Sequence, residues 1–133
     1  MNITTPLRRT LAAAAVAATA TTVLAAAPAH AGGDEVINTG NCSGTADWKV
    51  KAKFRDGGIE FEGEVDSNRN GQVWSWRIKH NGSVSAHGQS TTRGPSGSFS
   101  VERRMVDLSG TDQFVFRAVH NATGQVCRGT LSI

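Results

Sequence analysis

The strongest constraint on the fold is a strict alternation of apolar and charged residues between Trp48 and Asp66. Apolar residues alternate with basic ones in the first half of this segment and with acidic ones in the second half. The turn-forming sequence Asp56-Gly57-Gly58 separates the halves. A period of two places each class of side chain on one face of a strand, which predicts a β-hairpin with an apolar face and a charged face. Turns at Asp56-Gly57 or Gly57-Gly58 both set basic residues opposite acidic ones, and such pairs select the strand partner and its register. The alternative is that the charged face binds a ligand. We disfavour it because the opposed basic and acidic residues largely neutralise one another.

The rest of the chain also favours strands. No segment has the 3.6-residue period of a helix, and Gly, Asn, Asp and Ser interrupt the sequence at short intervals. We therefore expect an all-β domain, a single immunoglobulin-like β-sandwich of seven to eight antiparallel strands, with a small barrel as the alternative. Further strands are expected at Gln72–His80, at a short polar edge around Val84–Gly88, at Phe99–Val106, and in the segments led by Phe114 and containing Cys127. Connections are expected at Asn81-Gly82, Ser90–Gly97, Leu108–Asp112 and Asn121–Gly124.

The N-terminal segment has the three parts of a secretory signal peptide. Arg8 and Arg9 precede an uncharged, Ala-rich stretch over 11–27, and Ala29-His30-Ala31 is a small-x-small cleavage site. A transmembrane anchor is disfavoured because the stretch is short and contains several threonines. The sequence thus predicts a secreted, extracellular protein. Its expected parts are a signal peptide at 1–31, an N-terminal segment with a first strand region at 32–45, and the sandwich domain at 46–133.

Removal of the signal peptide changes the charge of the protein. The whole chain has 14 basic and 11 acidic residues, so losing Arg8 and Arg9 leaves 12 against 11, a formal charge of +1. The basic isoelectric point therefore does not by itself indicate a nucleic-acid or membrane partner. We expect a monomer that binds neither nucleic acid nor membrane, with an extracellular protein or polysaccharide as partner.

Cys42 and Cys127 are the two cysteines of the chain. In a secreted domain such a pair most often forms one disulfide, here tying the first strand region to the last strand. The alternatives are a free thiol and an intermolecular bond. A disulfide that closes a loop of roughly 85 residues lowers the entropy of the unfolded chain, which would add roughly 4–5 kcal/mol to the free energy of unfolding.

Motifs for catalysis or metal binding are weak. The Asp66–Gly71 segment matches the first half of a calcium loop, but Arg77 occupies the position of the required Glu, so a strand connection is favoured. His80 and His87 lack metal-ligand spacing and are expected at the surface. The regularly spaced Glu60, Glu62 and Glu64 could form a glycosidase pair, but they are expected to pair with lysines. We expect no enzyme, no catalytic residues, no cofactor and no metal.

Two groups of residues are candidates for ligand binding. Trp48, Trp74 and Trp76 could stack on sugar rings if exposed, as in cellulose- and chitin-binding modules, whereas the alternation favours core positions for Trp74 and Trp76. Arg93 lies in a Gly-, Pro- and Ser-rich loop that could present it to a trypsin-like protease, although most such loops are plain connections.

The pattern as a whole resembles a group of small secreted immunoglobulin-like β-sandwich proteins of actinobacteria. The resemblance rests on the Ala-rich leader, a W-x-W strand, T-T-R-x-P-S-G-S-F and a closing N-x-T-G-x-V-C-R-G-T. It implies the fold and export and supplies no activity. The expected function is that of a secreted, non-enzymatic binding or structural domain. The alternatives are a polysaccharide-binding module that uses exposed Trp and a protease inhibitor that presents Arg93.

Overall fold

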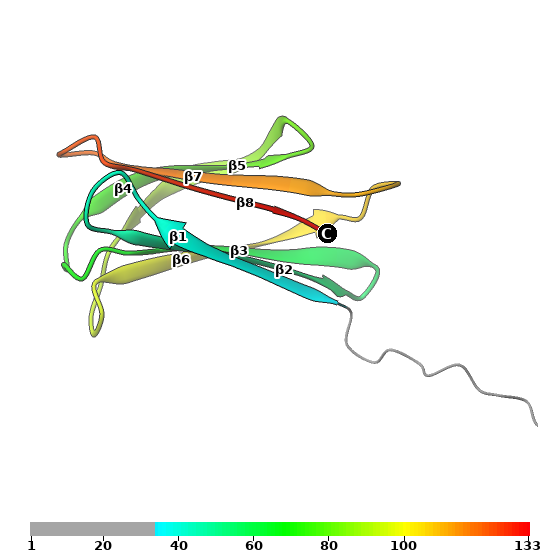
Figure 1. Cartoon of the computed structure of the whole chain (residues 1–133), viewed down its shortest axis with the longest axis horizontal. Coiled ribbons are helices and arrows are strands. Elements are labelled where there is room, and N and C mark those ends of the chain that lie inside the picture. The colour runs from blue at the N-terminus through cyan, green and yellow to red at the C-terminus, as the bar shows by residue number, and fades with distance from the viewer. Residues whose placement is uncertain (1–33) are drawn as a thin grey trace, which may run out of the picture.

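A computed structural model describes residues 34–133 as two antiparallel sheets of four strands, packed face to face (Figure 1). The described residues contain no helix, so the all-β prediction is confirmed. The expected signal peptide at 1–31 lies outside the described residues. The eight strands are β1 (Glu35–Asn41), β2 (Asp47–Arg55), β3 (Gly58–Asp66), β4 (Val73–His80), β5 (Ser83–Thr91), β6 (Ser98–Val106), β7 (Gln113–His120) and β8 (Val126–Ser132).

The strand order is β1-β2-β3-β6 in the first sheet and β5-β4-β7-β8 in the second. The chain builds β1 to β3 in succession and crosses to the second sheet for β4 and β5. It then returns for β6 and ends with β7 and β8 in the second sheet. The domain is therefore formed by two sheets and not by a closed barrel, and each sheet has one inward, apolar face.

The β2–β3 hairpin has the predicted register. Its turn is Asp56-Gly57, and both residues have positive φ, 50° and 74°, as a type I′ turn requires. The register places Lys49 opposite Glu64 and Lys51 opposite Glu62. Both pairs form ion pairs, with N–O distances of 3.4 Å and 3.2 Å.

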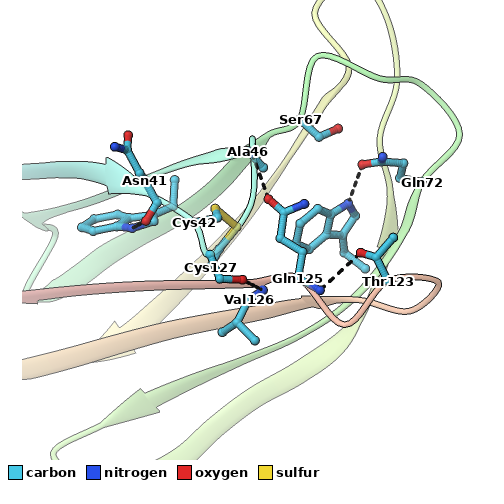
Figure 2. Close-up of a disulfide and its surroundings, with 12 residues drawn as sticks. Asn41, Cys42, Ala46, Ser67, Gln72, Thr123, Gln125, Val126 and Cys127 are labelled. Carbon is cyan, nitrogen blue, oxygen red and sulfur yellow. Dashed lines mark hydrogen bonds between the residues drawn. A yellow bond between two sulfur atoms is a disulfide. The ribbon is translucent and has the colours of Figure 1, made fainter.

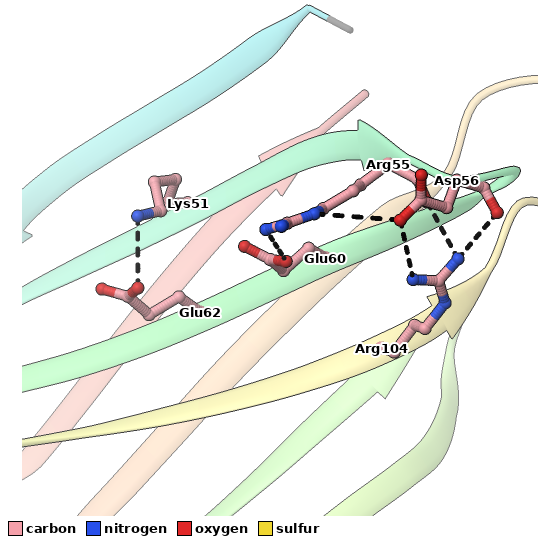
Figure 3. Close-up of polar contacts among 6 residues, drawn as sticks. All are labelled: Lys51, Arg55, Asp56, Glu60, Glu62 and Arg104. Atoms are coloured by element: carbon pink, nitrogen blue, oxygen red, sulfur yellow. Dashed lines mark hydrogen bonds and ion pairs between the residues drawn. The ribbon is translucent and has the colours of Figure 1, made fainter. Parts of the chain in front are cut away.

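The third opposed pair of this hairpin behaves differently. Lys53 lies opposite Glu60, but Glu60 pairs with Arg55 at 3.0 Å (Figure 3). At the turn, Arg104 of β6 donates hydrogen bonds to the backbone oxygens of Arg55 and Asp56. The charged face is thus largely neutralised within the first sheet, as the alternation predicts.

Replacement of Lys51 tests the contribution of one rung of this ladder. The hydrogen bond to Glu62 raises the pKa of Lys51 above its ordinary value of 10.5. The resulting stabilisation is fully present below pH 10.5 and is lost as the pH rises through the raised pKa. At neutral pH, Lys51→Gln should lower the free energy of unfolding by about 0.2–1 kcal/mol.

Urea denaturation measures this effect, with Lys53→Gln as the matched control because Lys53 forms no ion pair among residues 34–133. The difference between wild type and Lys51→Gln should vanish well above the raised pKa. A difference that persists there, or equal effects of the two variants at neutral pH, would contradict an electrostatic origin.

The core consists of the inward residues of both sheets. The rings of Phe61 from β3 and Phe114 from β7 stack with a centroid distance of 4.9 Å, which joins the two layers. Gly63 permits a close approach in the same region, because a Cβ atom there would lie 2.6 Å from the ring of Phe116. The sheets therefore approach at a position where the alternation of β3 provides no side chain.

The predicted disulfide between Cys42 and Cys127 is present and joins the segment after β1 to the start of β8 (Figure 2). The connection between β1 and β2 is also hydrogen-bonded to the end of β7–β8. Ser43 exchanges two hydrogen bonds with Val126, and the backbone N–H of Ala46 donates to the side chain of Gln125 at 2.9 Å. The bridge therefore holds the two sheets together along one side of the sandwich.

Strand β5 differs from its prediction. The expected short strand around Val84–Gly88 is in fact nine residues long and reaches Thr91, where a loop was expected. Beyond the strand, the N–H of Thr92 donates to Gln72 O at 2.9 Å, so pairing beside β4 continues further. A register shift at Ile78/Lys79 leaves one additional residue, Ser85, on β5 near the turn to β4. Backbone pairing with β4 outweighs the polar composition of this segment.

Candidate functional site

The candidate tryptophans of β4 lie in the core. Trp74 is completely buried and Trp76 is 6% exposed. The indole N–H of Trp74 donates to the side chain of Gln72, and that of Trp76 donates to Ser90 Oγ at 3.0 Å. The guanidinium of Arg103 covers the Trp76 ring, 5.2 Å from its centroid. Neither ring is free to stack on a sugar.

Trp48 is half-buried at the side of the sandwich where β1 and β8 approach. Its ring lies against two glycines, since Cβ atoms at Gly40 and Gly129 would come within 2.5 Å and 2.7 Å of it. The indole N–H donates to Asn41 O at 3.2 Å. Strand glycines on both sides thus make room for this ring, which indicates a packing role.

Arg93 is exposed, as predicted, but its backbone is already hydrogen-bonded. The N–H of Arg93 donates to Ser98 O, and its carbonyl oxygen accepts from the N–H groups of Gly97 and Ser98. A protease inhibitor that binds as an extended strand needs free backbone groups to pair with the enzyme. The closed turn leaves Arg93 without those groups, and the geometry does not favour the inhibitor hypothesis.

The prediction that His80 is a surface residue is wrong. His80 is 9% exposed, its ring stacks on Phe114, and its Nε2 donates to Oδ1 of the fully buried Asp112. His80 lies on the same inward face of β4 as Trp74, Trp76 and Ile78. The alternation of apolar residues along the strand was therefore the sequence signal for its burial. His87 is exposed, as expected.

Asp112 also anchors the end of the chain. Its backbone exchanges two hydrogen bonds with Ile133, and its Oδ1 accepts from the N–H of Leu108 at 3.4 Å. The second carboxylate oxygen, Oδ2, has no hydrogen-bond partner within residues 34–133. Since both side chains are buried against the core, the His80–Asp112 pair has the setting of a structural interaction.

The Asp66–Gly71 segment connects the end of β3 to β4, so the structure agrees with the expected strand connection rather than with a calcium loop. Asp66 accepts a hydrogen bond from the N–H of Asn68 at 3.0 Å, which is the geometry of an Asx turn. Asn68 and Gly71 have positive φ. Throughout residues 34–133, no three His, Cys, Asp or Glu side chains are grouped closely enough to hold a metal ion.

The second sheet has an unneutralised positive outer face. Its register aligns four basic residues on four adjacent strands, here called the basic row: His87 is opposite Arg77, Arg77 is opposite Arg117, and Arg117 is opposite Arg128. Lys79 lies next along β4 on the same face. We call these five residues the basic face.

No acidic residue compensates this charge within the sheet. Strands β4, β5, β7 and β8 contain neither Asp nor Glu, so all 11 acidic residues of the chain lie elsewhere. Like charges directly opposite one another destabilise a sheet. The first sheet sets basic strand β2 beside acidic strand β3, and this contrast within one molecule indicates that the basic face is not arranged for stability.

A shallow hollow of about 420 Å³ lies on this face, where β5, β4 and β7 meet. Arg77, His87 and Arg117 line it together with Ser75 and Gln89. Gln89 donates to Ser75 Oγ at 3.3 Å, and Ser75 in turn donates to Asn121 Oδ1 at 2.8 Å. Basic side chains and pre-oriented polar groups therefore lie side by side along the hollow, an arrangement suited to anions that also carry hydroxyl groups.

Sequence reasoning missed the basic row because its members come from four strands. The alternation places Arg77 and Lys79 on the outward face of β4, but it does not reveal which residues of β7 and β8 become their neighbours. The available signal was the absence of acidic residues from these four strands.

Together, fold and site define a class: a disulfide-closed, two-sheet β-sandwich domain with one basic sheet face. No protein-family model, curated protein or solved structure matches the chain. Within residues 34–133, no helix is long and apolar enough to span a membrane.

Proposed function

We propose that the protein is a secreted, non-enzymatic binding domain that holds an anionic extracellular ligand on the basic face. Secretion is supported by the signal-like sequence at 1–31 and by the disulfide, which is compatible with an oxidising environment. The observation that carries the binding proposal is the basic row, in which Arg77, Arg117 and Arg128 are adjacent without an acidic residue on their sheet.

We further propose that the sandwich is immunoglobulin-like. The order β5-β4-β7-β8 corresponds to strands C′, C, F and G of a variable-type immunoglobulin sheet. With β4 as strand C, strands β2, β3 and β6 of the first sheet correspond to A, B and E, and the chain crosses to the other sheet after β3 as an immunoglobulin chain does after strand B. The first sheet departs from the pattern at its edges, where β1 is added beside β2 and strand D beside β6 is missing.

The two earlier alternatives have less support. Buried Trp74 and Trp76 cannot act as exposed stacking platforms, and the backbone of Arg93 is occupied. The basic face provides free guanidinium groups instead, which bind carboxylate, sulfate and phosphate groups through paired hydrogen bonds. Charge complementarity thus favours an anionic ligand over a neutral one.

Retention on dextran sulfate beads tests this function, with uncharged dextran as the matched polymer. The wild-type protein should bind only dextran sulfate, and binding should weaken between about 0.1 M and 1 M salt as the Debye length falls from about 10 Å to about 3 Å. The triple variant Arg77→Gln/Arg117→Gln/Arg128→Gln should lose roughly tenfold or more in affinity, about 1.4 kcal/mol.

The matched control is Lys53→Gln/Arg69→Gln/Arg93→Gln, which removes three positive charges from outside the basic face. It should retain most of the affinity. Equal losses in the two triple variants would show that only net charge matters and would refute a localised binding face. Absence of retention of the wild-type protein would refute the function itself.

A further inference from the structure

We infer that the ligand of the basic face is an acidic polysaccharide that lies across the strands, along the basic row. This inference rests on the proposed function and specifies the ligand and its direction. His87, Arg77, Arg117 and Arg128 occupy β5, β4, β7 and β8 in register, so the row runs perpendicular to the strands.

The dimensions of the row favour a linear polymer. Adjacent strands are about 4.7–4.9 Å apart, so the basic residues of the row repeat at about that interval, with the three arginines on neighbouring strands. This spacing is close to the length of one sugar residue. Strands β5 and β8 are the two edges of the second sheet, so the row extends over its full width. A compact anion would instead need cationic groups that converge on one point.

The side chains of the row suit carboxylate or sulfate groups. Three of the four are arginines, whose planar guanidinium binds these groups in bidentate geometry. In the described part of the chain, none of the three forms an ion pair. Their donors therefore remain available to a ligand that carries one anionic group on each sugar residue.

The neighbouring row provides contacts for the sugar rings. Gln89, Ser75, Val119 and Val126 lie opposite one another across the same four strands. At one end, the hydrogen-bonded side chains of Gln89 and Ser75 can exchange hydrogen bonds with hydroxyl groups. At the other end, the two valines present apolar surface to the C–H groups of a sugar. The basic row beside a mixed polar and apolar row therefore matches an acidic polysaccharide.

Other polyanions fit this face less well. Single-stranded nucleic acids are usually bound with aromatic stacking, but Trp74, Trp76, Phe114 and Phe116 of the second sheet are all buried. A lipid surface is commonly engaged by inserted Trp, Phe or Leu side chains, and the outward positions of these four strands contain none of them. The face is therefore suited to charged groups and hydroxyls.

Titration with galacturonic-acid oligomers of increasing length tests the inference. Affinity, measured by calorimetry, should rise from the disaccharide to the tetrasaccharide, which spans the four strands, and change little for the hexasaccharide. Backbone NMR shifts should move in β4, β5, β7 and β8. Arg128→Gln removes one end of the row and should move the plateau to the trisaccharide, whereas the control Lys53→Gln should leave the length dependence unchanged.

The outcomes separate this inference from the proposed function. Retention on dextran sulfate without binding of any galacturonic-acid oligomer would overturn the assignment of a linear polysaccharide with one carboxylate on each sugar residue and leave anion binding in place. Binding without length dependence, or a plateau unaffected by Arg128→Gln, would overturn the track across the strands. Tighter binding to duplex DNA, single-stranded DNA or phosphatidylglycerol vesicles at equal ionic strength would overturn the choice of polysaccharide. Failure on dextran sulfate would overturn both proposals.

Discussion

Replacing both cysteines with alanine should lower the free energy of unfolding by about 4–5 kcal/mol, because the Cys42–Cys127 bond closes a loop with a sequence separation of 85. The bond restricts the unfolded chain, and longer loops lose more conformational entropy on closure. This loss is a large share of the roughly 5–15 kcal/mol that stabilises a typical domain. Alanine is preferable to serine because Cys127 is completely buried and a hydroxyl there would need a partner.

Urea denaturation of oxidised wild type, reduced wild type and the Cys42→Ala/Cys127→Ala variant measures this effect. Reduced wild type is the matched control, since it keeps both side chains but opens the loop. The reduced protein and the double variant should unfold at similar urea concentrations, far below that of the oxidised protein. Equal stability of oxidised and reduced wild type would contradict a stabilising role for the bond.

Asp112→Ala should be the most damaging exchange of a single charged residue, with a loss of about 1–3 kcal/mol for each buried donor that it leaves without an acceptor. The substitution leaves the buried ring of His80 and the N–H of Leu108 without their acceptor. Removing one member of a buried pair leaves the other desolvated without compensation. The effect should extend to the end of β8, because Asp112 pairs with Ile133 through its backbone.

Thermal and urea denaturation test this prediction, with Asp107→Ala as the control. Asp107 is exposed in the same connection and should change the stability by less than about 0.5 kcal/mol. Asp112→Asn keeps the shape and one acceptor oxygen and should recover part of the stability. Similar unfolding midpoints for Asp112→Ala and Asp107→Ala would refute the structural role of the buried pair.

Several features of the fold follow from local sequence. Alternation from Trp48 to Asp66 predicts the hairpin and its ion pairs because side-chain direction in a strand depends only on residue number. Asn81-Gly82 predicts the next turn because both residues tolerate the positive φ that they adopt, 47° and 86°. The pairing of Cys42 with Cys127 follows from there being only two cysteines in a chain expected to be secreted.

Other features depend on partners that are distant in sequence. The length of β5 depends on backbone pairing with β4 rather than on its polar residues. The burial of His80 requires a buried acceptor, which Asp112 supplies from a connection 32 residues away. Local patterning therefore underestimates strands and buried polar groups that long-range hydrogen bonds stabilise.

The candidate site shows the same division. The sequence alone determined that Arg77, Arg117 and Arg128 lie on strands and that these strands contain no acidic residues. Only the tertiary structure placed the three arginines side by side, because the register between β4, β7 and β8 comes from backbone pairing. The near-neutral formal charge of residues 32–133 is a sum over both sheets and their connections. A sum carries no information about position, and it is the separation of charge between the two sheets that creates the basic face.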